Sequence, residues 1–383
     1  MKYIILLLNI LLIAPVFCSG QDSKISRVRA YNRKKIPTPP GMVYIPGGTI
    51  VIRYNNEKGD SGGFKQVSLS PFFIDETEVT NKEYRRFVDN LKNNKDTTSK
   101  NKNVHAVTQN VHYDTGRAEI VKYPLTYFKR TADGKTGEYV TEMINVYPDT
   151  KVWATDFPNS QTDMLVKEYF TNPLFDDYPV VGITWKQARA YASWRSNNSM
   201  PHKKKRKRYL LDYDLPCTLP TEAQWVCAAE GEMRLSKIDS FRVPRDNKGR
   251  LLANFKQSEG DYTADGSSYT MHVKSYAPNR YGLYNMYGNV AEWTLDAYNE
   301  SAWAFVHDQN PVLLYDADAN EPPIMKRKVV RGGSWKDNAQ ALSPYNRNYE
   351  QQDAPHSYIG FRCVIPAPEI LTKKVASRNT KSK

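Results

Sequence analysis

This 383-residue sequence lacks the residue patterns of several common catalytic and metal sites. Its four cysteines form no zinc-binding pattern, and the chain has neither a glycine-rich phosphate loop nor a Ser-His-Asp order. Its six histidines include no close pair at metal-ligand spacing, so we expect ordinary surface or core residues. They are His105, His112, His202, His272, His307 and His356. These absences leave open an enzyme whose chemistry is not legible in the sequence.

The sequence also lacks an apolar run long enough to cross a membrane. Residues 3–17 are almost entirely apolar, but the run falls short of the about 18 residues that a spanning helix needs. At the N-terminus such a run predicts a secretory signal. It ends at Cys18, and a cysteine at that junction resembles the lipid-modified first residue of bacterial lipoproteins. We predict a lipoprotein signal segment, residues 1–18, and an acyl anchor at Cys18; cleavage a few residues further on is the alternative.

The charge of the chain is strongly unbalanced. Its 54 Lys and Arg against 41 Asp and Glu give a formal charge of +13, concentrated in residues 202–208 and in a basic tail, residues 367–383. A basic surface can attract nucleic acid, anionic lipid or an acidic protein. Because residues 202–208 have no interleaved aromatics and the chain is predicted to be exported, we expect no nucleic acid. We expect a solvated loop there, with an acidic protein surface or anionic lipid as the alternative.

Short elements dominate the rest of the chain. The apolar fraction of 40% is typical of a globular protein, but long periodic helices are absent. Residues 19–40 are polar and end in a Pro-rich stretch, which predicts a tether. Strands are predicted at 41–48, 66–74 and 176–183, and the polar, irregular segment 92–150 suggests an insertion.

Three threonines are predicted to begin helices. Thr80 has Glu83 three residues further on, which is the pattern of a capping box, and Thr184 and Thr221 also precede helical sequence. Apolar residues then recur at helical spacing. After Thr80 these are Tyr84, Phe87, Val88 and Leu91, and after Thr184 they are Ala188, Tyr191, Ala192 and Trp194.

Several blocks, taken together and in this order, resemble the formylglycine-generating-enzyme (sulfatase-modifying-factor) family. They are GMVYIPGGT, FFIDETEVTNKEYRRF, YPVVGITWKQARAYASW, LPTEAQW and YGLYNMYGNVAEWT…VVRGGSW…GFRC. The resemblance implies an α+β fold related to the C-type lectin fold, poor in regular secondary structure, in a single domain over residues 41–366.

Other blocks resemble one branch of this family, the gliding-motility lipoproteins of Bacteroidetes. They are KVWATDF, NPLFDDYPVVG, ESAWAFVHDQNP and MKRKVVRGGSWKD. The K-type lipoprotein of the type IX secretion machinery is most similar, and the J-type lipoprotein is the nearest other branch. The resemblance implies a structural protein, anchored by lipid at the periplasmic face of the outer membrane, that self-associates in a ring with an N-type gliding and secretion protein.

The resemblance also implies that the family's copper chemistry is absent. The enzymes carry two cysteines after the Gly-Gly-Ser-aromatic turn, and soft thiolates are the ligands that Cu(I) prefers. Here Ser334 matches the family serine, while Asp337 and Leu342 stand at the two cysteine positions. A carboxylate and an alkyl group cannot hold Cu(I) or attack a substrate thiol. We therefore expect no catalytic residue and no copper, and the scattered histidines predict no iron.

Family members bind calcium at two places, and this chain matches both sets of positions. Calcium takes six to eight oxygen ligands from carboxylates, amides and carbonyls. The first set is Asn254, Phe255 (carbonyl), Asp265 and Ser267 (carbonyl). The second set is Asn285, Gly288 (carbonyl), Val290 (carbonyl) and Glu292. Structural calcium is the prediction, and polar residues that only cap turns are the alternative.

Family members also link the Gly-Phe-Arg-Cys cysteine to the helix after Leu-Pro-Thr-Glu. Cys227 lies on that helix, two residues before the matching position, which holds Ala229. Cys227 and Cys363 are therefore a candidate disulfide in an oxidising compartment, and an unpaired state is the alternative.

Taken together, the sequence predicts a non-catalytic structural lipoprotein of the type IX secretion and gliding machinery. A glycan- or peptidoglycan-binding module is the alternative, suggested by the lectin-like fold and the many Tyr and Trp. An oxidase-type enzyme is less favoured.

Overall fold

A computed structural model describes most of the chain from residue 38 to residue 367. The described ranges are 38–55, 61–93, 108–113, 116–130, 137–159, 161–198, 216–230, 245–257, 263, 266–344 and 346–367. All of them belong to one unit, Thr38–Lys383. The signal segment with Cys18, the basic run 202–208, Asp265 and residues 368–383 lie outside the described residues.

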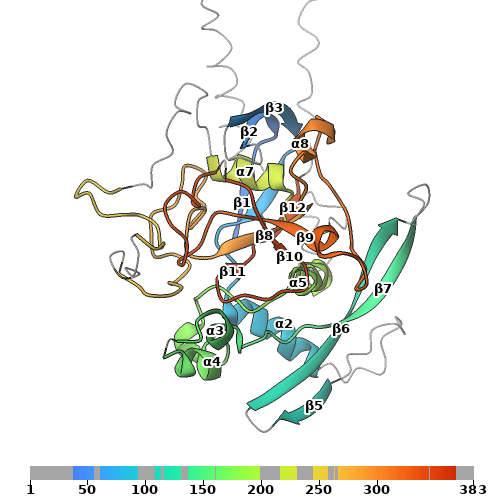
Figure 1. Cartoon of the computed structure of the whole chain (residues 1–383), viewed down its shortest axis with the longest axis vertical. Helices are drawn as coiled ribbons and strands as arrows, with labels where there is room; N and C mark the ends of the chain where they lie inside the picture. Colours follow the sequence, from blue (N-terminus) through green and yellow to red (C-terminus); the bar gives the residue numbers. More distant parts are fainter. Residues whose placement is uncertain are drawn as a thin grey trace, which may run out of the picture. The chain divides into compact units, whose positions relative to one another are not determined.

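One sheet joins the beginning and the end of the described unit. Its strand order is β1 (Met42–Ile45), β4 (Phe72–Asp75) and β12 (Val364–Pro366), with both pairs antiparallel. The central strand β4 has the sequence FFID, and all four of its residues are buried. The C-terminal strand therefore closes a sheet that the first strand opens (Figure 1).

A second sheet carries the segment that matches the family's catalytic region. Its order is β10 (Asn348–Gln351), β9 (Arg327–Arg331), β8 (Ala291–Ala297) and β11 (Ile359–Gly360), and β11 pairs with β8 in parallel. The remaining strands belong to two further sheets. These are β2 (Gly48–Asn55) with β3 (Ser61–Leu69), and β5 (Thr108–Tyr113) with β6 (Gly116–Arg130) and β7 (Gly137–Asn145).

The three predicted helix starts are confirmed. In α2 (Asn81–Asn93), Thr80 N donates to Glu83 Oε2 (3.0 Å), and Glu83 N donates back to Thr80 Oγ1 (3.2 Å). The same reciprocal pair begins α5 (Trp185–Asn198), between Thr184 and Gln187. It also begins α7 (Glu222–Glu230), between Thr221 and Gln224. Each box satisfies backbone donors that the first turn of a helix leaves unpaired.

The apolar faces of α2 and α5 form an aromatic core. Tyr84 stacks on Tyr191 with ring centroids 5.5 Å apart, and Phe87 lies 5.1 Å from Trp194. Phe361, next to the C-terminal strand, contacts both tyrosines edge-on. The apolar residues predicted at helical spacing are all buried. Shorter helical segments complete the described residues: α3 (Val152–Asp156), α4 (Asp163–Glu168), η1 (Pro173–Phe175), α8 (Ala302–Phe305) and η4 (Pro323–Lys326).

The segment 92–150 is not irregular where the structure describes it. It carries β5, β6 and β7, and Figure 1 shows β6 and β7 as a long ribbon beside α2 and α5. Along β6 the residues alternate: Val121, Tyr123, Leu125 and Tyr127 are buried against the body, and the residues between them face outward. This period of two identifies a half-buried strand.

Two of the predicted strands are wrong in detail. The strand predicted at 66–74 is interrupted at Pro71, so β3 ends at Leu69 and β4 pairs with different neighbours. The strand predicted at 176–183 forms only an isolated bridge between Thr80 and Pro179. Proline has no backbone donor for a ladder, and Gly182 has φ of 72°, outside the strand region. In the described part of the chain, no helix has the length and apolar character needed to span a membrane.

Candidate functional site

The segment predicted to match the family's catalytic region begins directly after β9. Gly332 and Gly333 have φ of 96° and 69°, in the left-handed region that favours glycine. A Cβ on Gly333 would lie 3.0 Å from the carbonyl oxygen of Ala341. The two glycines therefore allow a turn so tight that the chain packs against its own return segment, and Ser334 is fully buried behind it.

Asp337, predicted to stand at the first cysteine position, completes this turn. Its Oδ2 accepts hydrogen bonds from Ser334 N (3.0 Å) and from Ser334 Oγ (2.6 Å). Its backbone carbonyl accepts from Lys256 N at 2.9 Å. The carboxylate thus pairs the buried hydroxyl and an amide of the turn, which is the role of a local cap.

Leu342, predicted to stand at the second cysteine position, belongs to the core. Its side chain is 0% exposed and packs in a cluster with Ala253 and Phe255. The side chain of Tyr287 packs against the same cluster. The stretch 331–344 therefore offers one carboxylate that is occupied by Ser334 and one buried alkyl group, and it holds no thiol. Neither side chain can supply the soft ligand that Cu(I) requires.

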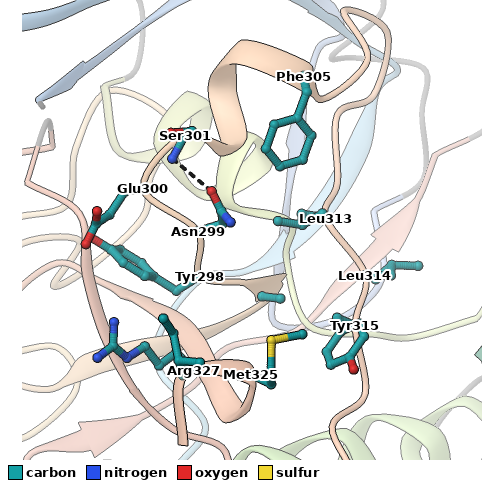
Figure 2. A pocket seen from close by; sticks show the side chains of 12 residues that line it. Tyr298, Asn299, Glu300, Ser301, Phe305, Leu313, Leu314, Tyr315, Met325 and Arg327 are labelled. Atoms are coloured by element: carbon teal, nitrogen blue, oxygen red, sulfur yellow. Dashed lines mark hydrogen bonds between the residues drawn. The ribbon is translucent and has the colours of Figure 1, made fainter. Parts of the chain in front are cut away.

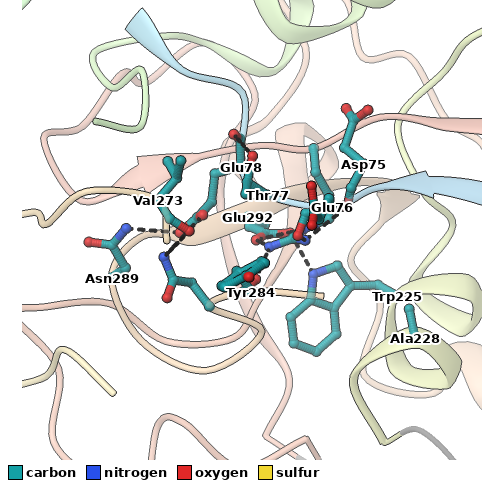
Figure 3. A network of polar contacts seen from close by, with 12 residues as sticks. Asp75, Glu76, Thr77, Glu78, Trp225, Ala228, Val273, Tyr284, Asn289 and Glu292 are labelled. Atoms are coloured by element: carbon teal, nitrogen blue, oxygen red, sulfur yellow. Dashed lines mark hydrogen bonds and ion pairs between the residues drawn. The ribbon is translucent and has the colours of Figure 1, made fainter. Parts of the chain in front are cut away.

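A buried ion pair lies beside this segment, between Glu292 on β8 and Arg362 (Figure 3). Glu292 Oε1 accepts from Arg362 Nε (2.9 Å) and Nη2 (2.7 Å). Glu292 Oε2 accepts from Arg362 Nε (2.7 Å) and from Trp225 Nε1 (2.8 Å). Arg362 Nη1 and Nη2 also donate to the carbonyls of Asp75 (3.1 Å) and Tyr284 (2.9 Å). The pair therefore connects the two sheets, α7 and the loop at Tyr284.

Glu78 forms a second buried group in the same network. Its Oε2 accepts from Asn285 Nδ2 (3.2 Å), and its Oε1 accepts from Asn289 Nδ2 (2.9 Å). Burial raises the pKa of Glu78 to about 8; Arg362 lowers it and Glu292 raises it further. The carboxyl thus holds its proton more tightly in the folded protein than in the unfolded chain.

The second predicted calcium set can be compared with this geometry. Asn285 Oδ1 is buried, and no hydrogen-bond partner for it exists among the described residues, as suits a ligand atom. Each oxygen of Glu292, however, already accepts two N–H groups, and its charge is matched by Arg362. A carboxylate oxygen has about two lone-pair sites, so Glu292 as arranged does not fit a calcium ligand. The carbonyls of Gly288 and Val290 remain predictions.

The first predicted calcium set is only partly described, because Asp265 lies outside the described residues. Asn254 is buried, and its Nδ2 donates to the carbonyl of Tyr269 (2.8 Å). Ser267 Oγ donates to the same carbonyl at 2.9 Å. Among the described residues there is no group of three or more His, Cys, Asp or Glu side chains placed to hold a metal. Calcium at Asn254, Phe255 and Ser267 stays a prediction.

The candidate disulfide between Cys227 and Cys363 is not formed in the structure. Cys217, Cys227 and Cys363 are all buried thiols. Cys227 packs with Ile45, Val67 and other residues in the core under α7. The cysteine near Cys363 is Cys217, which precedes α7: their chain neighbours Val364 and Thr218 form a bridge, and Cys217 helps to raise the pKa of the Cys363 thiol. The family resemblance pointed only to the helix after Leu-Pro-Thr-Glu, so the sequence did not indicate Cys217, which lies before that helix.

One histidine has two acidic partners. His356 Nδ1 lies 2.9 Å from Asp156 Oδ1, and its Nε2 lies 3.4 Å from Glu350 Oε2. Burial alone would lower the pKa of His356, but the hydrogen bonds to Asp156 and Glu350 outweigh it and raise the pKa to about 9. The imidazole is therefore charged at neutral pH and acts as a structural cation.

Sequence reasoning also missed a surface pocket of about 430 Å³ (Figure 2). Asn299, Glu300 and Ser301 supply polar groups at one side, and Asn299 Oδ1 accepts from Ser301 N at 2.9 Å. Arg327 adds a charged side chain, and apolar and aromatic side chains line the rest: Ala297, Tyr298, Phe305, Leu313, Leu314, Tyr315, Ile324 and Met325. The residues come from the end of β8, from α8 and from the chain between 313 and 327, so only the fold brings them together.

Comparison with known proteins agrees with this architecture. Formylglycine-generating enzyme from Thermomonospora curvata is 28% identical over 349 residues, covering 84% of this chain and 92% of that protein. "Inactive C-alpha-formylglycine-generating enzyme 2" from Mus musculus is 24% identical over 344 residues and covers 86% of each. The serine/threonine-protein kinase pkn1 of Chlamydia pneumoniae is 32% identical over 198 residues, which are 50% of this chain and 24% of the kinase.

Solved structures give the same picture of the fold. The structure of PvdO from Pseudomonas aeruginosa superposes with a TM-score of 0.50 at 17% identity, covering 85% of this chain and 94% of that one. The fold is thus a single domain of mixed helices and strands with modest regular secondary structure. The family model described as the sulfatase-modifying factor enzyme 1-like domain (FGE-sulfatase) matches residues 28–367, and the chain therefore belongs to this family.

Proposed function

We propose that this chain is a non-catalytic structural lipoprotein of the type IX secretion and gliding machinery. In this proposal it is exported, held at the periplasmic face of the outer membrane by an acyl anchor on Cys18, and assembled in a ring with the N-type partner protein. The observation that carries the non-catalytic part is the use of Asp337 and Leu342. One side chain caps the turn at Ser334, and the other fills the core.

Loss of catalytic activity has a parallel among the relatives of this chain. A mouse relative that covers 86% of this chain is named an inactive formylglycine-generating enzyme. The family resemblance places Gly332, Gly333 and Ser334 in the family's turn, and here the glycines have positive φ and the serine is buried. A well-built turn without thiols supports a structural role.

Assembly needs exposed surface that a partner can bury, and the β6–β7 ribbon supplies it. Phe128 and Tyr139 are paired across the ribbon, with ring centroids 5.4 Å apart, and they are 51% and 78% exposed. Met143, two cross-strand pairs further along on the same face, is 43% exposed. Exposed apolar clusters of this kind are typical of interaction sites.

Fractionation and size-exclusion chromatography test the proposal. Wild-type protein should pellet with the outer membrane, and Cys18→Ala should move it to the soluble periplasm, because stable anchoring needs acyl chains. Purified protein mixed with the N-type partner should elute as one large assembly. A compact monomer that ignores the partner would contradict the scaffold.

A glycan- or peptidoglycan-binding module is the second candidate, and the pocket in Figure 2 favours it. Tyr298 and Tyr315 offer aromatic faces, and Asn299 and Glu300 offer polar groups beside them. The relation to the C-type lectin fold that the family resemblance implies points the same way. Calorimetric titration with peptidoglycan fragments, using Tyr298→Ala as the control, decides between the two. Tight binding by a monomer that Tyr298→Ala abolishes would support the module.

A further inference from the structure

Cys217 and Cys363 meet between the C-terminal strand and the segment before α7. Their chain neighbours Thr218 and Val364 form an antiparallel bridge, with Thr218 N to Val364 O at 3.0 Å and Val364 N to Thr218 O at 2.7 Å. In this register Cys217 and Cys363 are diagonal neighbours on the same face of the bridged pair, and both side chains are buried. The Cys217 side chain also helps to raise the pKa of the Cys363 thiol, as expected of a near neighbour.

Each cysteine is also held in place by a separate element. Cys217 N donates to Ser196 Oγ of α5 at 2.7 Å. Cys363 N donates to Asp75 Oδ2 of β4 at 2.8 Å, and the same oxygen accepts from Arg195 Nη1 at 2.6 Å. The thiols therefore lie at one place in the core and are not brought together by chance rotations of exposed side chains.

We propose that Cys217 and Cys363 form a disulfide bond in the exported protein, which links β12 covalently to the segment before α7. The proposal rests on the export that the proposed function includes, because disulfides persist in oxidising compartments and are rare where thiols are kept reduced. In this proposal Cys227 stays a thiol: it lies on α7 and packs among apolar side chains that include Ile45 and Val67.

The bond forms by exchange with a disulfide-bonded thiol oxidoreductase of the exporting compartment. The two cysteines lose two protons and two electrons as the Sγ–Sγ bond forms, and the oxidoreductase disulfide gains them and becomes a dithiol. The attacking species is a thiolate, and burial raises the pKa of the Cys363 thiol in the folded protein. The exchange therefore takes place during folding, before β12 has closed over Cys363.

The disulfide would hold the edge strand β12 of the β1–β4–β12 sheet in place. β12 has three residues and is the last strand of the described chain. Such short terminal strands open easily unless they are tied down. The cross-link fixes this strand to a distant part of the chain, so reduction should loosen it before the rest of the unit unfolds.

Thiol labelling of the full-length exported protein tests the pairing. Protein purified without reductant is denatured, treated with excess maleimide and mapped by mass spectrometry, with a reduced sample as the control. We expect labelled Cys227 with unlabelled Cys217 and Cys363, and labelling of all three after reduction. Equal labelling of all three before reduction, or protection of Cys227, would overturn the proposal. The assay uses neither the secretion machinery nor the N-type partner, so failure of the ring proposal would leave its result unchanged.

Variants and hydrogen exchange provide the second measurement. Reductant should lower the melting temperature of wild type and of Cys227→Ser, and should leave Cys217→Ser and Cys363→Ser unchanged. In reduced wild type, the amides of Val364 and Ile365 should exchange at least tenfold faster. If a serine variant fails to fold, the labelling of the wild-type protein still decides whether Cys217 and Cys363 are linked. If labelling shows the disulfide but its reduction leaves the exchange of the Val364 and Ile365 amides unchanged, the bond does not lock β12. That result would overturn this part of the proposal.

Discussion

Glu292 and Arg362 are the two residues that do most to connect the described elements. Both side chains are buried, and together they bind Trp225 of α7 and the carbonyls of Asp75 and Tyr284. A buried ion pair gives little net stability against an apolar replacement, but removing one partner leaves an unpaired charge in the core. Glu292 was also predicted as a calcium ligand, and substitution can measure which role it has.

Replacing Glu292 by Gln should lower the free energy of unfolding by roughly 3 kcal/mol, because Arg362 then keeps its charge without a carboxylate. Denaturant unfolding with and without a calcium chelator measures this loss, and we expect the same loss in both conditions. Asp246→Asn, at the exposed Asp246–Arg250 pair, is the control and should change little. A chelator effect in wild type that Glu292→Gln removes would make Glu292 a calcium ligand.

Two residues predict how stability depends on pH. The folded pKa values of Glu78, raised from 4.5 to about 8, and of His356, raised from 6.5 to about 9, both lie above the ordinary values. A group with a raised folded pKa stabilises the protein fully below its unfolded pKa, and this contribution is lost as pH rises through the folded value. These two groups therefore contribute a fall in stability as pH rises from 4.5 to 9. Asp296, whose pKa burial raises to about 7, acts in the same direction at lower pH, whereas Lys328, whose pKa burial lowers to about 7, acts in the opposite direction above pH 7.

Denaturant unfolding across this range separates the two groups. Glu78→Gln should flatten the curve of stability against pH between 4.5 and 8, even though the amide loses a hydrogen bond to Asn285 or Asn289. His356→Gln should flatten it between 6.5 and 9. A curve of stability against pH that is unchanged in both variants would contradict both assignments.

At the scale of elements, the sequence predicted local structure well and long-range structure poorly. The capping boxes at Thr80, Thr184 and Thr221 depend on residues three positions apart, and all three were predicted. The ribbon β6–β7 was missed because many of its outward positions are polar, so its alternation resembles an irregular polar segment. The Glu292–Arg362 pair and the pocket join residues far apart in the chain, for which local pattern gives no signal.

The two faces of the β6–β7 ribbon should respond differently to substitution. Phe128→Ser combined with Tyr139→Ser should leave the melting temperature nearly unchanged, because both side chains are exposed, and should weaken assembly with the N-type partner at least tenfold. Leu125→Ala, on the buried face of the same strand, should cost roughly 3 kcal/mol of stability. Thermal melts and partner titration give both readouts. Full partner affinity in the double variant would remove this face from the interface.

At the scale of the whole molecule, the proposal is that the described unit has the family's fold and uses it for assembly. Gly332 and Gly333 form a tight turn, and at the predicted cysteine positions Asp337 caps this turn and Leu342 packs in the core. The β5–β6–β7 sheet carries exposed apolar surface in the segment that the sequence suggested to be an insertion. The central claim is that this frame supports assembly and performs no chemistry at Asp337.

Type IX export in cells that carry Asp337→Asn tests this claim most directly. The amide keeps an oxygen that can accept from Ser334 N and Oγ, so the variant should fold and should reach the outer membrane with its N-type partner. Gly333→Val is the matched control that should fail, because a β-branched residue is disfavoured at φ of 69°. We predict export at the wild-type level for Asp337→Asn and loss of export for Gly333→Val. Loss of export in Asp337→Asn, with the protein folded, abundant and located with its partner, would show that the carboxylate has a chemical role and would contradict the account.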